Sequence, residues 1–151
     1  MINYTSKFID KVNVFVDGAS RGNPGHAGIG GIIVDADNNA RLDDFCEYIG
    51  VKTNNEAEYL AIDKGLSVAR KHTRKLVRIF SDSEFVIRQI NKRYRIKQDR
   101  MEPLCLKVIE KERLFENVEF SHLRSNSSWI KRADMLANQA IERMLFRPLK
   151  T

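Results

Sequence analysis

The chain has 151 residues, of which 42% are hydrophobic, and this suits one compact domain and excludes a fibrous or disordered polypeptide. Lysine and arginine number 26 against 20 acidic residues, and the net charge of +6 favours a polyanionic partner, although a solvated basic surface explains it about equally well. The sequence holds no signal peptide and no run of about 18 apolar residues, and Cys46 and Cys105 lack metal-type or redox-type spacing, so we expect a cytoplasmic protein without a membrane anchor.

The first third of the chain predicts three strands joined by short turns. Valines alternate with polar residues from Lys11 to Asp17, the period of a strand with one buried face, and this strand is expected to stop at Gly18. The elements that follow are expected to be a glycine-rich turn over 18–25, a strand over about 27–34, a turn over 35–39 and a strand that ends near 51. Consecutive strands on short turns indicate an antiparallel meander.

From Thr53 onward, helical and strand patterns alternate. The expected elements are helices over 53–71, over 83–94, after Pro103 and over 132–146, with short buried strands over 76–80 and 118–123. This order predicts an α/β fold with a five-stranded mixed sheet, three antiparallel strands and two parallel additions, flanked by helices. We expect the domain to span 11–147, with 1–10 as an N-terminal extension and 148–151 as a tail.

Four acidic residues are candidates for a catalytic site: Asp17, Glu58, Asp82 and Asp134. Each also has an ordinary explanation. Asp17 suits the start of a turn, and the other three suit first turns of helices, where the helix dipole favours an acid. The segments 53–56 and 81–84 each match a capping box, which explains their residues without any function.

Taken together, the four acids indicate a metal site. Asp17 and Asp82 are expected at the carboxyl ends of parallel, adjacent strands, with the other two acids on helices that pack on the same sheet. Carboxylates gathered at one point repel one another unless divalent cations neutralise them. Oxygen ligands without a His or Cys cluster favour Mg²⁺, with Mn²⁺ as the alternative, over zinc. Two such ions can activate water and stabilise the leaving oxygen in phosphodiester hydrolysis.

Four segments of the chain carry a resemblance to a known family. They are Val-Asp-Gly-Ala-Ser-Arg-Gly-Asn-Pro-Gly at 16–25, Thr-Asn-Asn-Glu-Ala-Glu-Tyr at 53–59, Ser-Asp-Ser at 81–83 and Arg-Ala-Asp-Met-Leu-Ala at 132–137. In this order they resemble the motifs of type 1 ribonuclease H, and the resemblance extends from about Lys11 to Met144. It implies the ribonuclease H-like fold and an endonuclease that hydrolyses the RNA strand of RNA–DNA hybrids. The chain is similar to the short form, without the extra basic helix or the N-terminal hybrid-binding domain.

The resemblance also implies roles for individual residues. Asp17 would bridge two Mg²⁺ ions, and Glu58, Asp82 and Asp134 would complete the catalytic cage. A metal-bound water would attack the RNA phosphate and leave 5′-phosphate and 3′-hydroxyl ends. The hybrid, partly through its RNA 2′-hydroxyls, would contact Gly18, Ser20, Asn23, Thr53, Asn54 and Asn55. For Asn54 and Asn55, turn and cap chemistry is the competing explanation.

Two positions depart from the family's pattern. Arg124 stands where bacterial relatives carry a His in the loop before the last acid, and we place it among the substrate-binding residues. Shorter members often have an Arg in this loop, so the departure does not exclude activity. Ile130 stands where the family usually has an Asn, whereas His122 is expected to belong to the fifth strand. The basic run within 91–100 favours contact with a nucleic acid backbone slightly over a solvated face.

Three alternatives to a hybrid-directed nuclease stay open. A nuclease of the same fold could act on double-stranded RNA or on a DNA junction, although Asn54 and Asn55 beside Glu58 disfavour a junction enzyme. A catalytically silent hybrid-binding module is disfavoured by the intact acid quartet. An ATPase would need the glycine-rich segment to bind nucleotide, but its spacing matches neither a P-loop nor a dinucleotide fingerprint. The expected partner is an RNA–DNA hybrid, with double-stranded RNA as the alternative, and no obligate protein partner is indicated.

Overall fold

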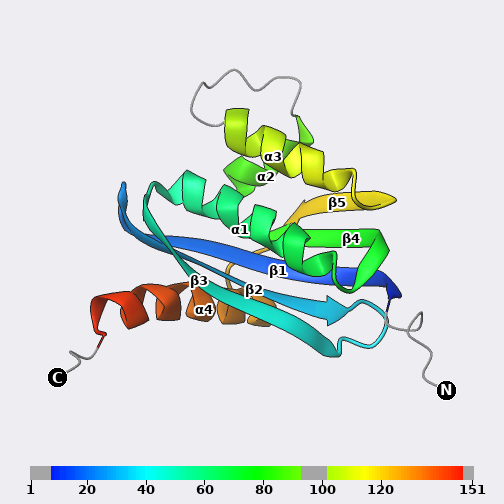
Figure 1. The fold of residues 1–151 in the computed structure, drawn as a ribbon, viewed down its shortest axis with the longest axis horizontal. Helices are drawn as coiled ribbons and strands as arrows, with labels where there is room; N and C mark the ends of the chain where they lie inside the picture. Colours follow the sequence, from blue (N-terminus) through cyan, green and yellow to red (C-terminus); the bar gives the residue numbers. More distant parts are fainter. Residues whose placement is uncertain (1–7, 93–101, 148–151) are drawn as a thin grey trace.

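The computed structural model describes residues 8–92 and 102–147, and within them the chain forms one mixed sheet and four helices (Figure 1). In chain order the elements are β1 (Ile9–Gly22), β2 (Gly25–Asp35), β3 (Arg41–Lys52), α1 (Asn54–Ala69), β4 (Thr73–Ser81), α2 (Glu84–Asn91), α3 (Glu102–Glu112), β5 (Asn117–His122) and α4 (Ser128–Leu145). Most of the basic run within 91–100 lies outside the described residues. No helix in the described part of the chain combines the length and the apolar character needed to cross a membrane.

The sheet has the strand order β3-β2-β1-β4-β5, with β1 at its centre. The pairs β1–β2 and β2–β3 are antiparallel, whereas β1–β4 and β4–β5 are parallel. The first three strands therefore form the predicted meander, and β4 and β5 are the two predicted parallel additions. The prediction of the fold class is confirmed.

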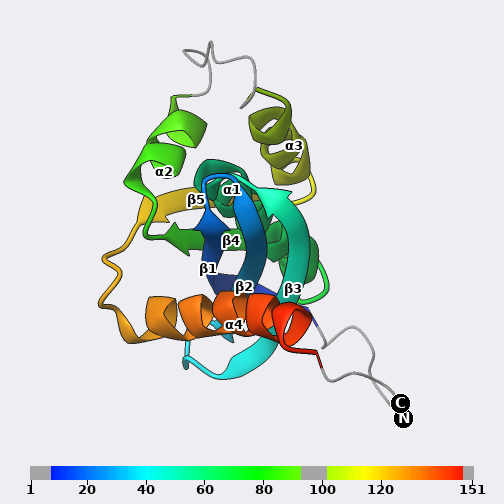
Figure 2. The same cartoon turned by 90° about the vertical axis from the view of Figure 1, so that its left-hand side faces the viewer.

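Helices cover both faces of the sheet. Figures 1 and 2 show α1, α2 and α3 on one side and α4 alone on the other. The alternation along β1 divides the core accordingly, because successive side chains of a strand point to opposite faces. Val14 and its valine neighbours pack with α1, and Phe15 packs with Ile130 of α4. Phe15 also stacks between Phe80 and Trp129, with ring centroids 5.1 and 5.5 Å away.

The helix α4 lies directly on the backbone of β2, because two glycines of that strand leave room for it. A Cβ atom added at Gly30 would lie 2.3 Å from the carbonyl oxygen of Ala133, and one at Gly28 would lie 2.4 Å from that of Ala137. Gly30 is also the cross-strand partner of Asp17. The close approach of α4 therefore takes place next to a predicted catalytic acid.

The first strand is longer than predicted. It does not stop at Gly18 but continues to Gly22, because residues 18–22 pair with residues 25–29 of β2. The predicted eight-residue turn is thus mostly the end of a hairpin with Asn23 and Pro24 at its tip. Asp17 consequently lies inside a strand. The parallel pairing of β1 with β4 nevertheless ends at Phe15 and Phe80, just before Asp17, so the two strands part where the acid is placed.

The last helix also begins earlier than predicted, at Ser128 instead of position 132. The reason is that Trp129 and Ile130 pack into the core beneath α4 and so belong to its first turn. Asp134 therefore lies past the first turn of α4, and Glu58, the fifth residue of α1, lies past the first turn of its helix. The explanation of these two acids by the helix dipole was wrong.

Candidate active site

The structure brings together the four predicted acids from four separate stretches of the chain. Asp17, Glu58 and Asp82 each offer a carboxylate oxygen, and these three atoms lie within 4.8 Å of one another. The side chain of Asp134 approaches this group from α4 and interacts with that of Asp17. Asp17 is 5% exposed and Glu58 7% exposed, while Asp82 is half-buried and Asp134 is exposed.

The surroundings of Asp17 and Glu58 disfavour the charged forms of these two acids. Burial raises the pKa of Asp17 well above its usual range, and the neighbouring carboxyls of Glu58, Asp134 and Asp82 raise it further. Burial also raises the pKa of Glu58, although hydrogen bonds to its carboxylate oppose this. Positive charge supplied nearby would favour the ionised forms of Asp17 and Glu58. A set of hard oxygen donors with this need fits divalent cations such as Mg²⁺ or Mn²⁺.

Glu58 is held in place by a hydrogen bond to each of its oxygens. The backbone N–H of Gly18 donates to Oε1 at 2.8 Å, and the buried hydroxyl of Ser81 donates to Oε2 at 3.1 Å. The contact with Gly18 requires a glycine, because a Cβ atom there would lie 2.4 Å from the backbone carbon of Ala57. β1 and α1 therefore meet backbone to backbone, and this contact brings Glu58 beside Asp17.

Ser81 is a site residue that the sequence analysis assigned to another role. The motif at 81–84 predicted that Ser81 caps α2, but the N-cap is Ser83, whose hydroxyl accepts a hydrogen bond from the N–H of Val86. Ser81 is the last residue of β4, and its oxygen accepts a hydrogen bond from the N–H of Ser83 at 3.1 Å. Its own proton is directed to Glu58. The predicted capping box of α1, from Thr53 to Glu56, is present.

Asp134 is supported by two further residues that the sequence analysis missed. The amide of Asn138 donates to Asp134 Oδ1 at 3.1 Å and to the backbone carbonyl of Asp134 at 3.0 Å. Arg21 of β1 donates to Asn138 Oδ1 at 3.1 Å. One available signal was the spacing of four residues between Asp134 and Asn138, which places two polar side chains on the same face of a helix.

Six of the seven predicted substrate-binding residues lie along one surface beside the acids. This surface is formed by the β1–β2 hairpin and the start of α1, and it contains Gly18, Ser20, Asn23, Thr53, Asn54 and Asn55. The two segments are joined directly, because Asn23 Oδ1 accepts a hydrogen bond from the backbone N–H of Asn54 at 3.0 Å. Asn54 is exposed, whereas the hydroxyl of Ser20 faces the carbonyl oxygen of Lys52 at 2.8 Å.

The two positions that depart from the family's pattern have different environments. Arg124 is exposed in the loop between β5 and α4, apart from the hairpin surface, and its carbonyl oxygen accepts a hydrogen bond from Ser127. Ile130 is 1% exposed and belongs to the core beneath α4. His122 is the last residue of β5, as predicted. The substitution at 130 therefore serves packing.

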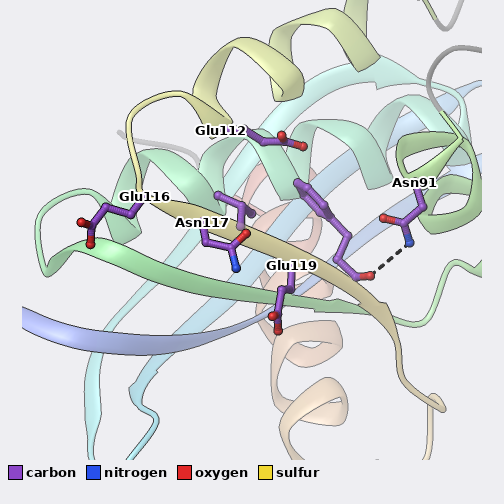
Figure 3. Close-up of a pocket in the computed structure, with 7 residues that line it drawn as sticks. Asn91, Glu112, Glu116, Asn117 and Glu119 are labelled. Atoms are coloured by element: carbon purple, nitrogen blue, oxygen red, sulfur yellow. Dashed lines mark hydrogen bonds between the residues drawn. The ribbon is translucent and has the colours of Figure 1, made fainter.

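A cavity elsewhere in the molecule is less suited to catalysis. It has a volume of about 480 Å³ and follows the outer edge of β5, two strands away from β1 (Figure 3). Its lining includes Glu112, Glu116 and Glu119, but Glu119 is paired with Arg78 at 3.1 Å. The amide of Asn91 is also engaged, because it donates to the carbonyl oxygen of Phe120 at 3.2 Å. Among the described residues, the carboxylates that line this cavity do not converge as those around Asp17 do.

Comparisons with known proteins show which sequences and structures the chain is similar to. The family model described as reverse transcriptase-like matches residues 15–140. The chain is 31% identical to a ribonuclease H of Polaromonas sp., over 91% of the chain and 92% of the relative. It is 34% identical to the bifunctional protein Rv2228c of Mycobacterium tuberculosis, over 87% of the chain but only 36% of that protein. The chain thus spans about a third of the length of this larger relative.

A solved structure is also similar to the chain over most of its length. LC11-RNase H1, solved in complex with an RNA/DNA hybrid, is 32% identical and superposes with a TM-score of 0.78, covering 89% of this chain and 99% of that one.

Proposed function

Because the chain belongs to the ribonuclease H family, we propose that it is an endonuclease that hydrolyses the RNA strand of RNA–DNA hybrids. The observation that carries the proposal is the convergence of Asp17, Glu58 and Asp82 within 4.8 Å, with Asp134 beside them. We assign the activity to residues 9–147, since β1 begins at Ile9, two residues before the predicted start of the domain.

The four acids are the proposed ligands of two divalent cations, Mg²⁺ or Mn²⁺, with Asp17 shared between them. Bound cations would neutralise the carboxylates, activate water and stabilise negative charge at the scissile phosphate. The contribution of the other residues is to hold the four acids in place. Gly18 and Ser81 fix both oxygens of Glu58, and the glycines of β2 let α4 carry Asp134 up to Asp17.

The proposed reaction is a displacement at the phosphorus of the RNA strand. A water oxygen forms a bond to phosphorus and the water gives up a proton, while the bond from phosphorus to the 3′-oxygen breaks. The leaving oxygen takes up a proton, so the products are a 5′-phosphate and a 3′-hydroxyl. The resemblance in all four motifs supports this outcome, because the four acids of this chain stand where the motifs of type 1 ribonuclease H carry their acids.

The hairpin surface is the proposed binding site for the hybrid. It borders the acids, and it presents small and amide-bearing residues that can approach a minor groove and its 2′-hydroxyls. The complex of LC11-RNase H1 with an RNA/DNA hybrid supports a substrate of this kind. Arg124 lies between Asp82 and Asp134 in the sequence and is the proposed contact from the loop before α4.

Cleavage of matched duplexes tests the proposal. The full chain is incubated with a labelled RNA–DNA hybrid, double-stranded RNA and duplex DNA of one sequence, with Mg²⁺, with Mn²⁺ and with a chelator. We expect the RNA strand of the hybrid to be cut only when a divalent cation is present, with 5′-phosphate and 3′-hydroxyl ends. Asp17→Asn should lower the rate by at least about 100-fold while binding of the hybrid is retained.

The other outcomes identify the alternatives. Hybrid that is bound but never cut by the wild-type protein would indicate a silent binding module. Equal cutting of hybrid and double-stranded RNA would indicate a broader nuclease of the same fold. Heat release on titration with ATP would support nucleotide binding by the glycine-rich segment.

A further inference from the structure

A chain of three polar side chains connects β1 to the fourth acid. Arg21 Nη2 donates to Asn138 Oδ1 at 3.1 Å, and Asn138 Nδ2 donates to Asp134 Oδ1 at 3.1 Å. Arg21 and Asp17 are four residues apart on one strand, so their side chains leave the same face of β1, the face that α4 covers. Arg21 also reaches Glu142, one turn further along α4, at 3.4 Å.

The chemistry of arginine determines how the amide of Asn138 is oriented. A guanidinium group can only donate hydrogen bonds, so the atom of Asn138 that faces Arg21 must be its carbonyl oxygen. The NH₂ group must then face Asp134, where both a carboxylate oxygen and a backbone carbonyl accept from it. With Arg21 in place, the reversed amide would set two donors against each other on one side and two acceptors on the other.

This arrangement bears on Asp134 in particular. Asp17 and Glu58 are buried and Glu58 is held by two hydrogen bonds, whereas Asp134 is exposed on the surface of α4. An exposed aspartate can turn its carboxylate among several rotamers unless a neighbour holds it in one. The hydrogen bond from Asn138 engages Oδ1 and leaves Oδ2 available to a cation that Asp17 also binds.

We propose that Asn138, oriented by Arg21, is a positioning residue that holds the Asp134 carboxylate in the conformation that binds a divalent cation together with Asp17. This inference rests on the proposed function. Neither Asn138 nor Arg21 is a ligand in this scheme; they act through Asp134. Groups that orient metal ligands in this way typically change metal affinity by 10- to 100-fold when they are removed.

The test measures cation binding without any nucleic acid. Free Mn²⁺ is followed by electron paramagnetic resonance during titration of the full chain, and the thermal unfolding midpoint is recorded in a chelator. We expect Asn138→Ala to weaken Mn²⁺ binding by about 10-fold. The unfolding midpoint of the metal-free protein should change little, because the lost contacts lie at the surface of α4. A merely structural role would instead lower the midpoint and leave the affinity unchanged.

A double-mutant cycle tests the role of Arg21. Arg21→Ala should weaken Mn²⁺ binding in the wild-type background, by less than Asn138→Ala does, and should add nothing once Asn138 is alanine. Additive effects would show that Arg21 acts independently and would overturn the relay. Glu142→Gln removes the charged partner of Arg21 on the same helix, and Gln139→Ala removes a neighbouring amide. Both control variants should bind Mn²⁺ within about twofold of the wild type.

The remaining outcomes separate this proposal from the proposed function. If the wild-type chain and Asn138→Ala bind Mn²⁺ equally well, the positioning role is wrong and the nuclease function stands. If the wild-type chain binds no Mn²⁺ at all, both are overturned. If Arg21→Ala raises only the KM for the hybrid, with unchanged Mn²⁺ affinity, Arg21 contacts nucleic acid directly and the relay is again overturned.

Discussion

The hydroxyl of Ser81 is buried next to the site and has one carboxylate to donate to. Replacing it by alanine removes the hydrogen bond to Glu58 Oε2 and leaves that oxygen without the buried donor that stabilises it. We expect Ser81→Ala to lower the rate of hybrid cleavage by about 10-fold at limiting Mg²⁺ and to raise the Mg²⁺ concentration needed for half-maximal rate. Steady-state cleavage over a range of Mg²⁺ concentrations measures both effects.

A second serine two residues away provides the control. Ser83→Ala removes the N-cap of α2 and should cost about 1 kcal/mol in the free energy of unfolding, with little effect on the Mg²⁺ dependence. If the two variants shift the Mg²⁺ dependence equally, Ser81 has no special relation to Glu58.

At the residue scale, the acids were easier to predict from the sequence than the side chains that hold them in place. Asp17, Glu58, Asp82 and Asp134 stand in recognisable motifs, so their convergence could be expected before the structure was known. Ser81 could not be predicted, because the spacing from Ser81 to Glu84 fits a helix cap and nothing local distinguishes the two roles. Arg21 and Asn138 are 117 positions apart, and only the packing of α4 on β2 brings them together.

At the scale of elements, the contact between α4 and β2 decides where Asp134 lies. A methyl group at Gly30 would meet the backbone of α4, 2.3 Å from the oxygen of Ala133 and 2.6 Å from the nitrogen of Ala137. Gly30→Ala should therefore push the helix away from the sheet. We expect a loss of about 1–3 kcal/mol in the free energy of unfolding, and a loss of cleavage activity because Asp134 moves away from Asp17. Chemical denaturation and cleavage assays measure the two losses.

Gly50 provides a matched control for this variant. Its φ of 84° strains any residue with a Cβ atom, but it has open space around it and lies on β3, away from the acids. Gly50→Ala should cost about 1 kcal/mol of stability and retain the cleavage rate of the folded protein. If Gly30→Ala also retains that rate, the helix does not set the position of Asp134.

The pattern of elements was predictable, but some of their limits were not. Alternation and helical period gave the order of strands and helices, because one buried face repeats every two residues in a strand and every three to four in a helix. The run from Gly18 to Gly22 was predicted as a turn because it is rich in small residues. It is a strand because residues 25–29 of β2 pair with it, and such a pairing is not visible in either segment alone.

For the molecule as a whole, the fold carries an electrostatic cost at the site. The fold brings the carboxyls of Asp17, Glu58 and Asp82 into one region with Asp134 beside them, and the carboxyls of Asp17 and Glu58 are almost fully buried. The sequence allowed this convergence to be predicted from strand ends and motif order. It did not show how deeply Asp17 would be buried, because burial depends on how the helices pack on the two faces of the sheet (Figure 1).

The stability of the metal-free protein should therefore fall as the pH rises. The pKa of Asp17 is higher in the folded state than its ordinary value of 3.8, so the folded state binds the proton more tightly than the unfolded chain does. The stabilisation is fully present below that ordinary value and is lost as the pH rises toward the raised pKa, at most about 1.4 kcal/mol per pH unit. In a chelator, we expect the unfolding midpoint to decrease from pH 5 to pH 8.

Asp17→Asn should be more stable than the wild type at pH 8 and should show a weaker pH dependence, whereas Asp37→Asn at an exposed turn should behave like the wild type. Millimolar Mg²⁺ should stabilise the wild type at pH 8 but stabilise Asp17→Asn much less. A wild-type midpoint that is independent of pH in the chelator would mean that the carboxyls do not oppose folding, and the main physical reason for placing cations among them would be lost.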